Sequence, residues 1–163
     1  YGMGAFRLAK DLKISRSEAQ DYIDRYFARF SAVKDFMDRT IAEGKGRGYV
    51  TTLLGRRRYV PELRSRNFNR RSGAERAAIN TPVQGTAADI IKLAMLRVDS
   101  VLSNRQSQAR MLLQVHDELV FDVPNSEVDE LVGVLKTEME EVVQLKVPLT
   151  VQVAHGHNWN EAH

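Results

Sequence analysis

The spacing of apolar residues predicts two helices in the first third of the chain. Over residues 15–30, apolar residues recur every three or four positions, which is the pattern of an amphipathic helix. Residues 15–18 read Ser-Arg-Ser-Glu, a capping box, so this helix is expected to start there and to run to about Phe30. Ser31 is expected to cap a second helix with similar spacing, which ends at the glycines of residues 44–48.

Two other segments have patterns typical of β-hairpins. Residues 49–60 favour two short strands with a turn at Leu54-Gly55. Residues 111–123 hold two apolar runs separated by a short polar segment, which predicts a second hairpin. Residues 62–72 are polar and rich in arginine, so they are expected to form a loop.

The rest of the chain is mostly helical by pattern. Residues 73–104 carry apolar residues at helical spacing, and Pro82 and Gly85 are expected to kink or break that helix. A further helix is expected to start at residues 125–126. Residues 147–153 alternate between apolar and polar side chains, which predicts a final strand.

These elements indicate the α+β class. The hairpins are local, and no strand–helix–strand unit is visible, so the sheet is expected to be antiparallel. It is predicted to contain the 111–123 hairpin and the 147–153 strand, with long helices packed against it.

Composition narrows the kind of protein. The 163 residues fit one domain or a large part of one, and 43% hydrophobic residues suffice for a core. Without cysteine, disulfides and thiolate metal sites are excluded. No signal peptide is visible, and no apolar run approaches the roughly 18 residues of a membrane span, so we expect a cytoplasmic protein without a membrane partner. The first residue is Tyr1 rather than a methionine, which suggests a fragment.

Charge is distributed unevenly along the chain. Residues 1–110 carry 22 Lys and Arg against 11 Asp and Glu, whereas residues 111–163 carry 2 against 10. Eight arginines fall within residues 56–76, and arginine favours bidentate contacts with phosphate. The basic part is therefore a candidate for contact with a polyanion, and the acidic part for binding cations. An ordinary solvated charged face is the alternative.

The 111–123 hairpin carries the first candidate site. His116, Asp117 and Glu118 lie between its two apolar runs, where two adjacent carboxylates repel each other unless a positive charge is near. Magnesium ions prefer oxygen ligands, so Asp117 and Glu118 are candidate metal ligands. A solvated turn explains the same residues without any function.

Residues 74–85 carry the second candidate site. Arg76, Asn80 and Gln84 are spaced four residues apart, which on a helix places three hydrogen-bonding side chains on one stripe. Arg, Asn and Gln are the side chains that pair with base edges, so this stripe is a candidate for contact with a nucleic-acid groove. Pro82 weakens strict helical spacing, and an ordinary polar helix face is the alternative.

Taken together, these motifs resemble the bacterial DNA polymerase I family (family A). The resemblance is carried, in the family's order, by residues 1–6, 48–58, 75–89 and 113–118, and it extends to the tail at 156–163. It implies that residues 1–70 are the C-terminal part of a helical fingers subdomain. Residues 71–163 would be the C-terminal part of the palm.

The resemblance also implies roles for individual residues. Asp117 would be a catalytic ligand of a magnesium pair, with Glu118 as an auxiliary carboxylate. Tyr1 would lie at the insertion site for the incoming dNTP. The residues that would contact primer-template DNA are Arg70, Arg71, Arg76, Asn80, Gln84 and His116. The implied reaction is template-directed DNA synthesis, by attack of the primer 3′-hydroxyl on a dNTP, in DNA replication and repair.

Part of the family's site is expected to lie outside these 163 residues. The resemblance puts the second catalytic aspartate and the nucleotide-binding Arg and Lys upstream of Tyr1. The isolated chain is therefore expected to be inactive, and to form a non-native dimer through an exposed sheet edge. A non-catalytic piece that binds duplex DNA is the alternative function, and an RNA-binding module is a third that rests on the arginines alone.

Overall fold

The computed structural model describes residues 2–162. The chain divides into two compact units, Tyr1–Thr86 and Ala87–His163, and each is treated by itself below. The boundary between the units, after Thr86, comes later in the sequence than the predicted boundary between residues 70 and 71. The division follows packing, and the assignment of fingers and palm stays a prediction.

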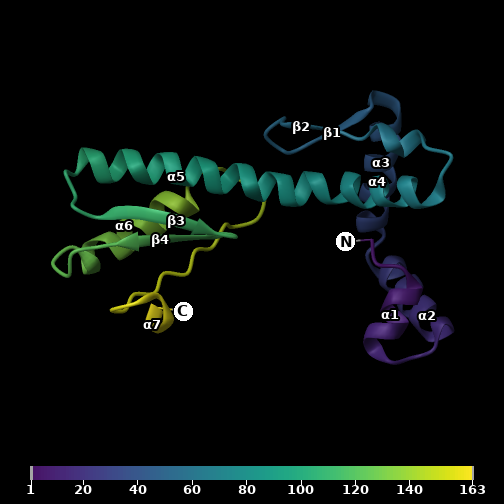
Figure 1. Cartoon of the computed structure of the whole chain (residues 1–163), viewed down its shortest axis with the longest axis horizontal. Helices are drawn as coiled ribbons and strands as arrows, with labels where there is room; N and C mark the ends of the chain where they lie inside the picture. The colour runs from purple at the N-terminus through teal and green to yellow at the C-terminus, as the bar shows by residue number, and fades with distance from the viewer. Residues whose placement is uncertain (1, 163) are drawn as a thin grey trace. The chain divides into compact units, whose positions relative to one another are not determined.

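The first unit begins with three helices. They are α1 (Ala5–Leu12), α2 (Arg16–Arg29) and α3 (Ser31–Arg47), and α1 and α2 lie side by side (Figure 1). The capping box predicted at the start of α2 is present, with Ser15 and Glu18 bonded to each other's backbone N–H groups. The predicted cap of α3 is wrong, because Ser31 is already helical and makes no cap bond.

A short hairpin and a 3₁₀ turn follow the helices. The strands are β1 (Tyr49–Thr51) and β2 (Arg57–Tyr59), paired antiparallel, so the first predicted hairpin is confirmed. The 3₁₀ turn η1 (Pro61–Arg64) buries Leu63, and α4 (Phe68–Asn80) begins soon after it. The loop predicted over residues 62–72 is therefore wrong for most of its length.

Helix α4 is followed by a π-helical turn, η2 (Thr81–Gly85), and then by α5 (Thr86–Asn104). The interruption predicted at Pro82 and Gly85 is confirmed. The core of the first unit lies where α4, η1 and the β1–β2 hairpin meet. Its buried members are Val50, Val60, Leu63, Ala74 and Ala78.

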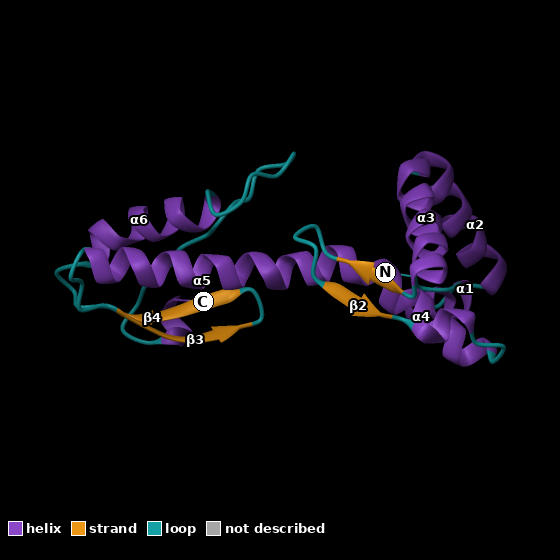
Figure 2. Cartoon of the chain, turned by 90° about the horizontal axis from the view of Figure 1, so that it is seen from above, coloured by secondary structure: helices purple, strands orange, loops and turns teal. Residues whose placement is uncertain are grey.

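The second unit is built from α5, a hairpin and one more long helix. The hairpin strands are β3 (Arg110–Val115) and β4 (Glu118–Asp122), and the helix is α6 (Val128–Glu140). In Figure 2 the strands and α6 flank α5. One core joins all three, with Val98, Leu102, Ala109, Leu131 and Leu135 buried. The second predicted hairpin is confirmed, whereas α6 starts slightly later than expected.

The predicted final strand is wrong. Residues 147–153 have no strand structure, and the two sheets of the described chain are the β1–β2 and β3–β4 pairs. The backbone N–H of Val151 donates to the Glu140 carboxylate at 2.8 Å, so this segment is bonded to α6 instead of to a neighbouring strand. Pro148 has no N–H, so it cannot donate a hydrogen bond to a neighbouring strand. The chain closes with the short helix α7 (Trp159–Ala162).

The predicted fold class holds despite that missing strand. Helices and small antiparallel sheets are mixed along the chain, as expected for an α+β protein. Within the part of the chain that is described, no helix is both long and apolar enough to cross a membrane.

Candidate nucleic-acid interface and carboxylate pair

The predicted stripe of Arg76, Asn80 and Gln84 follows two kinds of helix. Arg76 and Asn80 lie one turn apart on α4, as their spacing predicts. Gln84 lies on the π turn η2, where hydrogen bonds span five residues and a turn takes up more chain. A regular stripe of three is therefore wrong. Two residues share an α-helical face, and the position of the third depends on how η2 is held.

Pro82 explains why the chain leaves α-helical geometry here. Proline has no N–H for the carbonyl four residues earlier, and its ring clashes with that carbonyl. Two threonine hydroxyls donate hydrogen bonds to backbone carbonyls near the interruption of the helix. Thr81 Oγ1 donates to Ala77 O at 2.6 Å, and Thr86 Oγ1 donates to Pro82 O.

The β1–β2 hairpin packs directly on this turn. A Cβ built at Gly85 would lie 2.7 Å from Thr52 Cγ2, so glycine is required for the hairpin to approach this closely. Arg56 Nη2 donates to Gly85 O at 2.9 Å, and the Leu53 N–H donates to Thr86 Oγ1 at 2.8 Å. Thr52 Oγ1 in turn accepts from the Arg56 N–H at 3.1 Å. We call Thr52, Arg56, Gly85 and Thr86 the hairpin junction.

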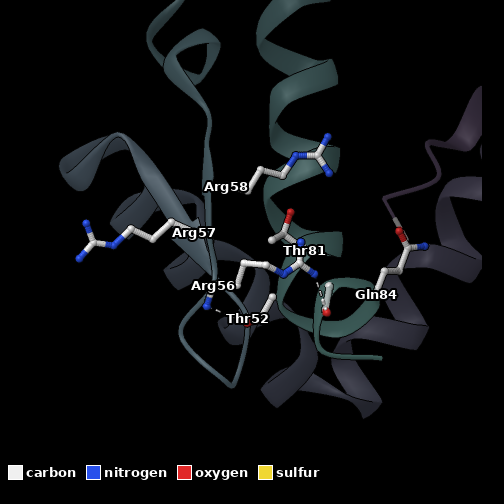
Figure 3. Close-up of a pocket in the computed structure, with 7 residues that line it drawn as sticks. Thr52, Arg56, Arg57, Arg58, Thr81 and Gln84 are labelled. Carbon is white, nitrogen blue, oxygen red and sulfur yellow. Dashed lines mark hydrogen bonds between the residues drawn. The ribbon is translucent and has the colours of Figure 1, made fainter. Parts of the chain in front are cut away.

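A cavity of about 300 Å³ lies at the hairpin junction (Figure 3). It is lined by Thr52, Arg56, Arg57, Arg58, Thr81, Gln84 and Gly85. Figure 3 shows the Arg57 side chain turned away from Gln84, and Arg57 lies 4.7 Å from the centre of the Tyr49 ring. With three arginines and Gln84 around it, the cavity suits an anionic or hydrogen-bonding ligand.

The arginines of residues 56–76 are not equivalent, although the sequence suggested one basic surface. Arg64 bonds the carbonyls of Lys45 and Gly46 at the end of α3, which is a structural role. Arg71 is half-buried and bonds Ser65 O at 3.1 Å. Arg70, one residue earlier on α4, is exposed. Contact with a polyanion is thus better suited to Arg70 than to Arg71.

Gly2, the first described residue, lies against α4. Gly2 has φ +79°, and a Cβ built there would lie 3.0 Å from Ile79 Cδ1 and 3.2 Å from Arg76 Cγ. The exposed Arg76 side chain also donates to Ser72 Oγ at 3.2 Å. The structure thus brings the backbone after Tyr1 beside Arg76. Tyr1 itself lies outside the described residues.

In the second unit, the predicted carboxylates lie at the tip of the β3–β4 hairpin. Val115 pairs with Glu118, which leaves His116 and Asp117 as a two-residue loop. His116 has φ 55°, the left-handed conformation that such tight hairpin loops use. The Gln114 side-chain amide donates to His116 O at 2.7 Å and fixes the loop peptide. His116, Asp117 and Glu118 are all exposed.

Asp117 and Glu118 supply the type of donor that Mg²⁺ takes, which is a carboxylate oxygen. They are adjacent in sequence and both are accessible, so the donor chemistry fits this metal. Among residues 2–162, no group of three or more His, Asp or Glu side chains is close enough to form a metal site by itself. Asp117 and Glu118 thus stay candidate ligands, and they do not form a complete metal site among the described residues.

Sequence reasoning missed the residues that fix the turn. Thr52, Arg56 and Thr86 were not predicted as site residues, although they hold the backbone on either side of Gln84. A signal was present, because two threonines flank the Pro82–Gly85 break and an arginine follows the predicted hairpin turn. The pairing of those two segments is a tertiary contact that spacing does not reveal.

Comparison with known proteins gives one consistent result. The family model described as DNA polymerase family A matches residues 1–161. The chain is 51% identical to DNA polymerase I of Geobacillus stearothermophilus over 99% of its length, and 50% identical to that of Pseudomonas aeruginosa over 100%. It spans 18% of each of these relatives.

A solved structure gives the same answer for the fold. The chain is similar to the POL domain of Pol1 from M. smegmatis in complex with DNA primer-template and dNTP. The TM-score is 0.96 at 46% identity, covering 99% of this chain and 29% of that one.

Proposed function

Because the chain belongs to DNA polymerase family A, we propose that it is a segment of a template-directed DNA polymerase and works in replication and repair. The observation that carries the proposal is about 50% identity over the whole chain to DNA polymerase I of several bacteria. The solved relative bound to primer-template and dNTP supports these two as the partners. Such a substrate is consistent with a cytoplasmic location.

We assign the chemistry to the β3–β4 tip. Asp117 would hold catalytic Mg²⁺, with Glu118 as an auxiliary ligand, because both offer accessible carboxylate oxygens. When bound, the metal pair supplies stabilisation of the attacking and leaving oxygens of phosphoryl transfer. His116, next to Asp117 in the loop, is assigned to the primer terminus. Gln114, bonded to the carbonyl of His116, keeps this loop in shape.

The contacts with primer-template are assigned mainly to α4 and η2. Arg76, Asn80 and Gln84 carry donors suited to the minor groove, and Arg70 is an exposed cation for the DNA backbone. Arg71 is kept as a weaker candidate, since Ser65 O already accepts from its guanidinium. Tyr1 is assigned to the dNTP insertion site. Residues 1–70 are assigned to the fingers and 71–163 to the palm.

The isolated 163-residue chain is expected not to extend primers. The family needs a second catalytic aspartate and a nucleotide-binding helix, and the resemblance puts both outside these residues. The alternative is that the chain by itself only binds duplex DNA. The predicted dimer receives no support from the relatives and stays a prediction, which light scattering over a range of concentrations would test.

An exchange experiment tests the proposed function. The corresponding segment of DNA polymerase I from Bacillus subtilis, which is 51% identical, is replaced by these 163 residues. The chimera is expected to extend a primer in a template-dependent way, whereas the isolated chain is expected to give no extension. A soluble chimera that binds primer-template but extends nothing would contradict the proposal.

Two variants of the chimera test whether extension depends on Asp117 in particular. Asp117→Ala in the active chimera is expected to abolish extension while primer-template binding is kept. Asp122→Ala is the matched control, because it removes an exposed carboxylate from the far end of the same strand β4. Equal loss of extension in both variants would argue against a special role for Asp117.

A further inference from the structure

The position of Gln84 depends on residues that are distant in sequence. Gln84 itself lies on η2, and it is exposed. The backbone on its C-terminal side is held by Arg56, whose Nη2 donates to Gly85 O at 2.9 Å. One step further on, Thr86 Oγ1 accepts from the Leu53 N–H and donates to Pro82 O. The turn is thus bonded to the hairpin at its last residue and at the residue after it.

Arg56 is itself held in place before it reaches the turn. Its backbone N–H donates to Thr52 Oγ1 at 3.1 Å, and its N-terminal neighbour Gly55 has φ +85°, a conformation suited to glycine. Thr52 is buried and faces the bare Cα of Gly85. The guanidinium therefore starts from a fixed backbone and ends on the carbonyl that follows Gln84.

Hydrogen bonds from a neighbouring segment matter more for a π turn than for a regular α-helix. The bonds of a π turn span five residues, it occurs mostly as single turns inside α-helices, and such turns are frequent at functional sites. Pro82 removes one backbone donor within the turn. The Arg56 guanidinium adds a donor from the hairpin at Gly85 O, the carbonyl of the last residue of the turn. Figure 3 shows this bond beside the labelled Gln84.

We propose that Arg56 is a positioning residue, which holds the η2 turn from the β1–β2 hairpin and thereby sets the orientation in which Gln84 meets primer-template DNA. The proposal rests on the proposed function for the role of Gln84 in DNA binding. It does not depend on that function for the structural step, in which the hairpin holds the turn. Arg56 would act through Gln84, and the neighbouring Arg57, the first residue of β2, would not.

The structural step is tested without DNA, by amide hydrogen exchange on the 163-residue chain. In Arg56→Ala, the amides of residues 83–86 are expected to exchange at least about tenfold faster, with the amides of α6 unchanged. Arg57→Ala is the control, because it removes the same charge from the adjacent position but leaves the bond to Gly85 O. Unchanged exchange at 83–86 in Arg56→Ala, or equal acceleration in both variants, would overturn the proposal.

The functional step is tested by a double-mutant cycle on primer-template binding, measured by fluorescence anisotropy. Gln84→Ala is expected to weaken binding about tenfold, and Arg56→Ala about fivefold. If Arg56 acts through Gln84, Arg56→Ala in the Gln84→Ala background costs less than about twofold more. Arg57→Ala is expected to have the same effect in both backgrounds.

The outcomes of the cycle separate the two proposals. Additive effects of Arg56→Ala and Gln84→Ala would overturn the positioning role and leave the proposed function standing. Wild-type chain that does not bind primer-template would count against the assignment of DNA contacts to this unit. In that case amide exchange still decides whether Arg56 holds the turn.

Discussion

The turn that carries Gln84 and the hairpin tip that carries Asp117 differ in how they are supported. The turn lies between two helices, and it is bonded by Arg56 and Thr86 to a hairpin some thirty residues earlier in the chain. The tip is a two-residue loop whose shape comes from its own strand, through Gln114 and His116. The first is fixed by tertiary contacts and the second by local ones.

Charge follows the same division. The unit Tyr1–Thr86 carries 18 Lys and Arg against 9 Asp and Glu, and the unit Ala87–His163 carries 6 against 12. A basic unit with hydrogen-bond donors on α4 and η2 suits a long polyanion, which makes many contacts. An acidic unit with accessible carboxylates suits a few metal ions. The charge of the two units is thus in keeping with the proposed function, which assigns DNA binding mainly to the first unit and chemistry mainly to the second.

The largest effects on stability are expected from the two separate cores. Leu63 is 1% exposed in the first unit and Leu131 is 3% exposed in the second. Replacement of either by alanine is expected to cost about 2–5 kcal/mol, from lost burial and the cavity left behind. Amide exchange should show faster opening in the altered unit only. Equal acceleration of amide exchange in both units would show that the two units unfold together and not independently.

A pair of glycine variants tests the hairpin junction more finely. Gly85→Ala is expected to destabilise the first unit by about 1–3 kcal/mol, because the added methyl meets Thr52 Cγ2. Gly73→Ala is the matched control within helix α4, where nothing lies within 4 Å of the new Cβ, and it is expected to stabilise by up to about 1 kcal/mol. Urea unfolding would measure both. If Gly85→Ala left the free energy of unfolding unchanged, the β1–β2 hairpin would not pack tightly against Gly85.

The smallest effect is expected at the α2 cap, far from both candidate sites. Ser15→Ala is expected to cost about 1 kcal/mol. Hydrogen bonds from the backbone and side chain of Ser15 lower the pKa of Glu18. A lowered folded-state pKa means that this contribution is present above the unfolded-state pKa and is lost as the pH falls through the folded-state pKa. The loss of stability caused by Ser15→Ala should therefore be somewhat smaller at acidic than at neutral pH, because only the part carried by the Ser15 side-chain bond to the Glu18 carboxylate is lost on protonation. Urea unfolding of the wild type and Ser15→Ala at both pH values would measure it.

The sequence predicted local features well. The capping box at Ser15, both hairpins and the break at Pro82 and Gly85 each depend on a few neighbouring residues, and all are present. The family was also recognisable, because its motifs occur in order along the chain. The π form of η2 was not predictable, since proline alone is equally consistent with a simple kink.

Apart from the wrong cap at Ser31 and the later start of α6, the errors came from tertiary contacts. Residues 62–72 look like a loop because they are polar, but Leu63 is buried and the Arg71 guanidinium bonds Ser65 O. Residues 147–153 alternate like a strand, yet a strand needs a partner, and Val151 bonds a carboxylate of α6 instead. The role of Arg56 depends on a contact with Gly85, 29 residues away, which no local pattern encodes.

The most direct test of this division is a side-by-side measurement of Asp117→Ala and Gln84→Ala in the active chimeric polymerase. Single-turnover extension and equilibrium binding of primer-template are measured for each variant. Asp117→Ala is expected to slow extension by about a thousandfold or more with binding changed less than about twofold. Gln84→Ala is expected to weaken binding about tenfold. If Asp117→Ala kept a near-normal extension rate, the assignment of chemistry to the hairpin tip would be wrong.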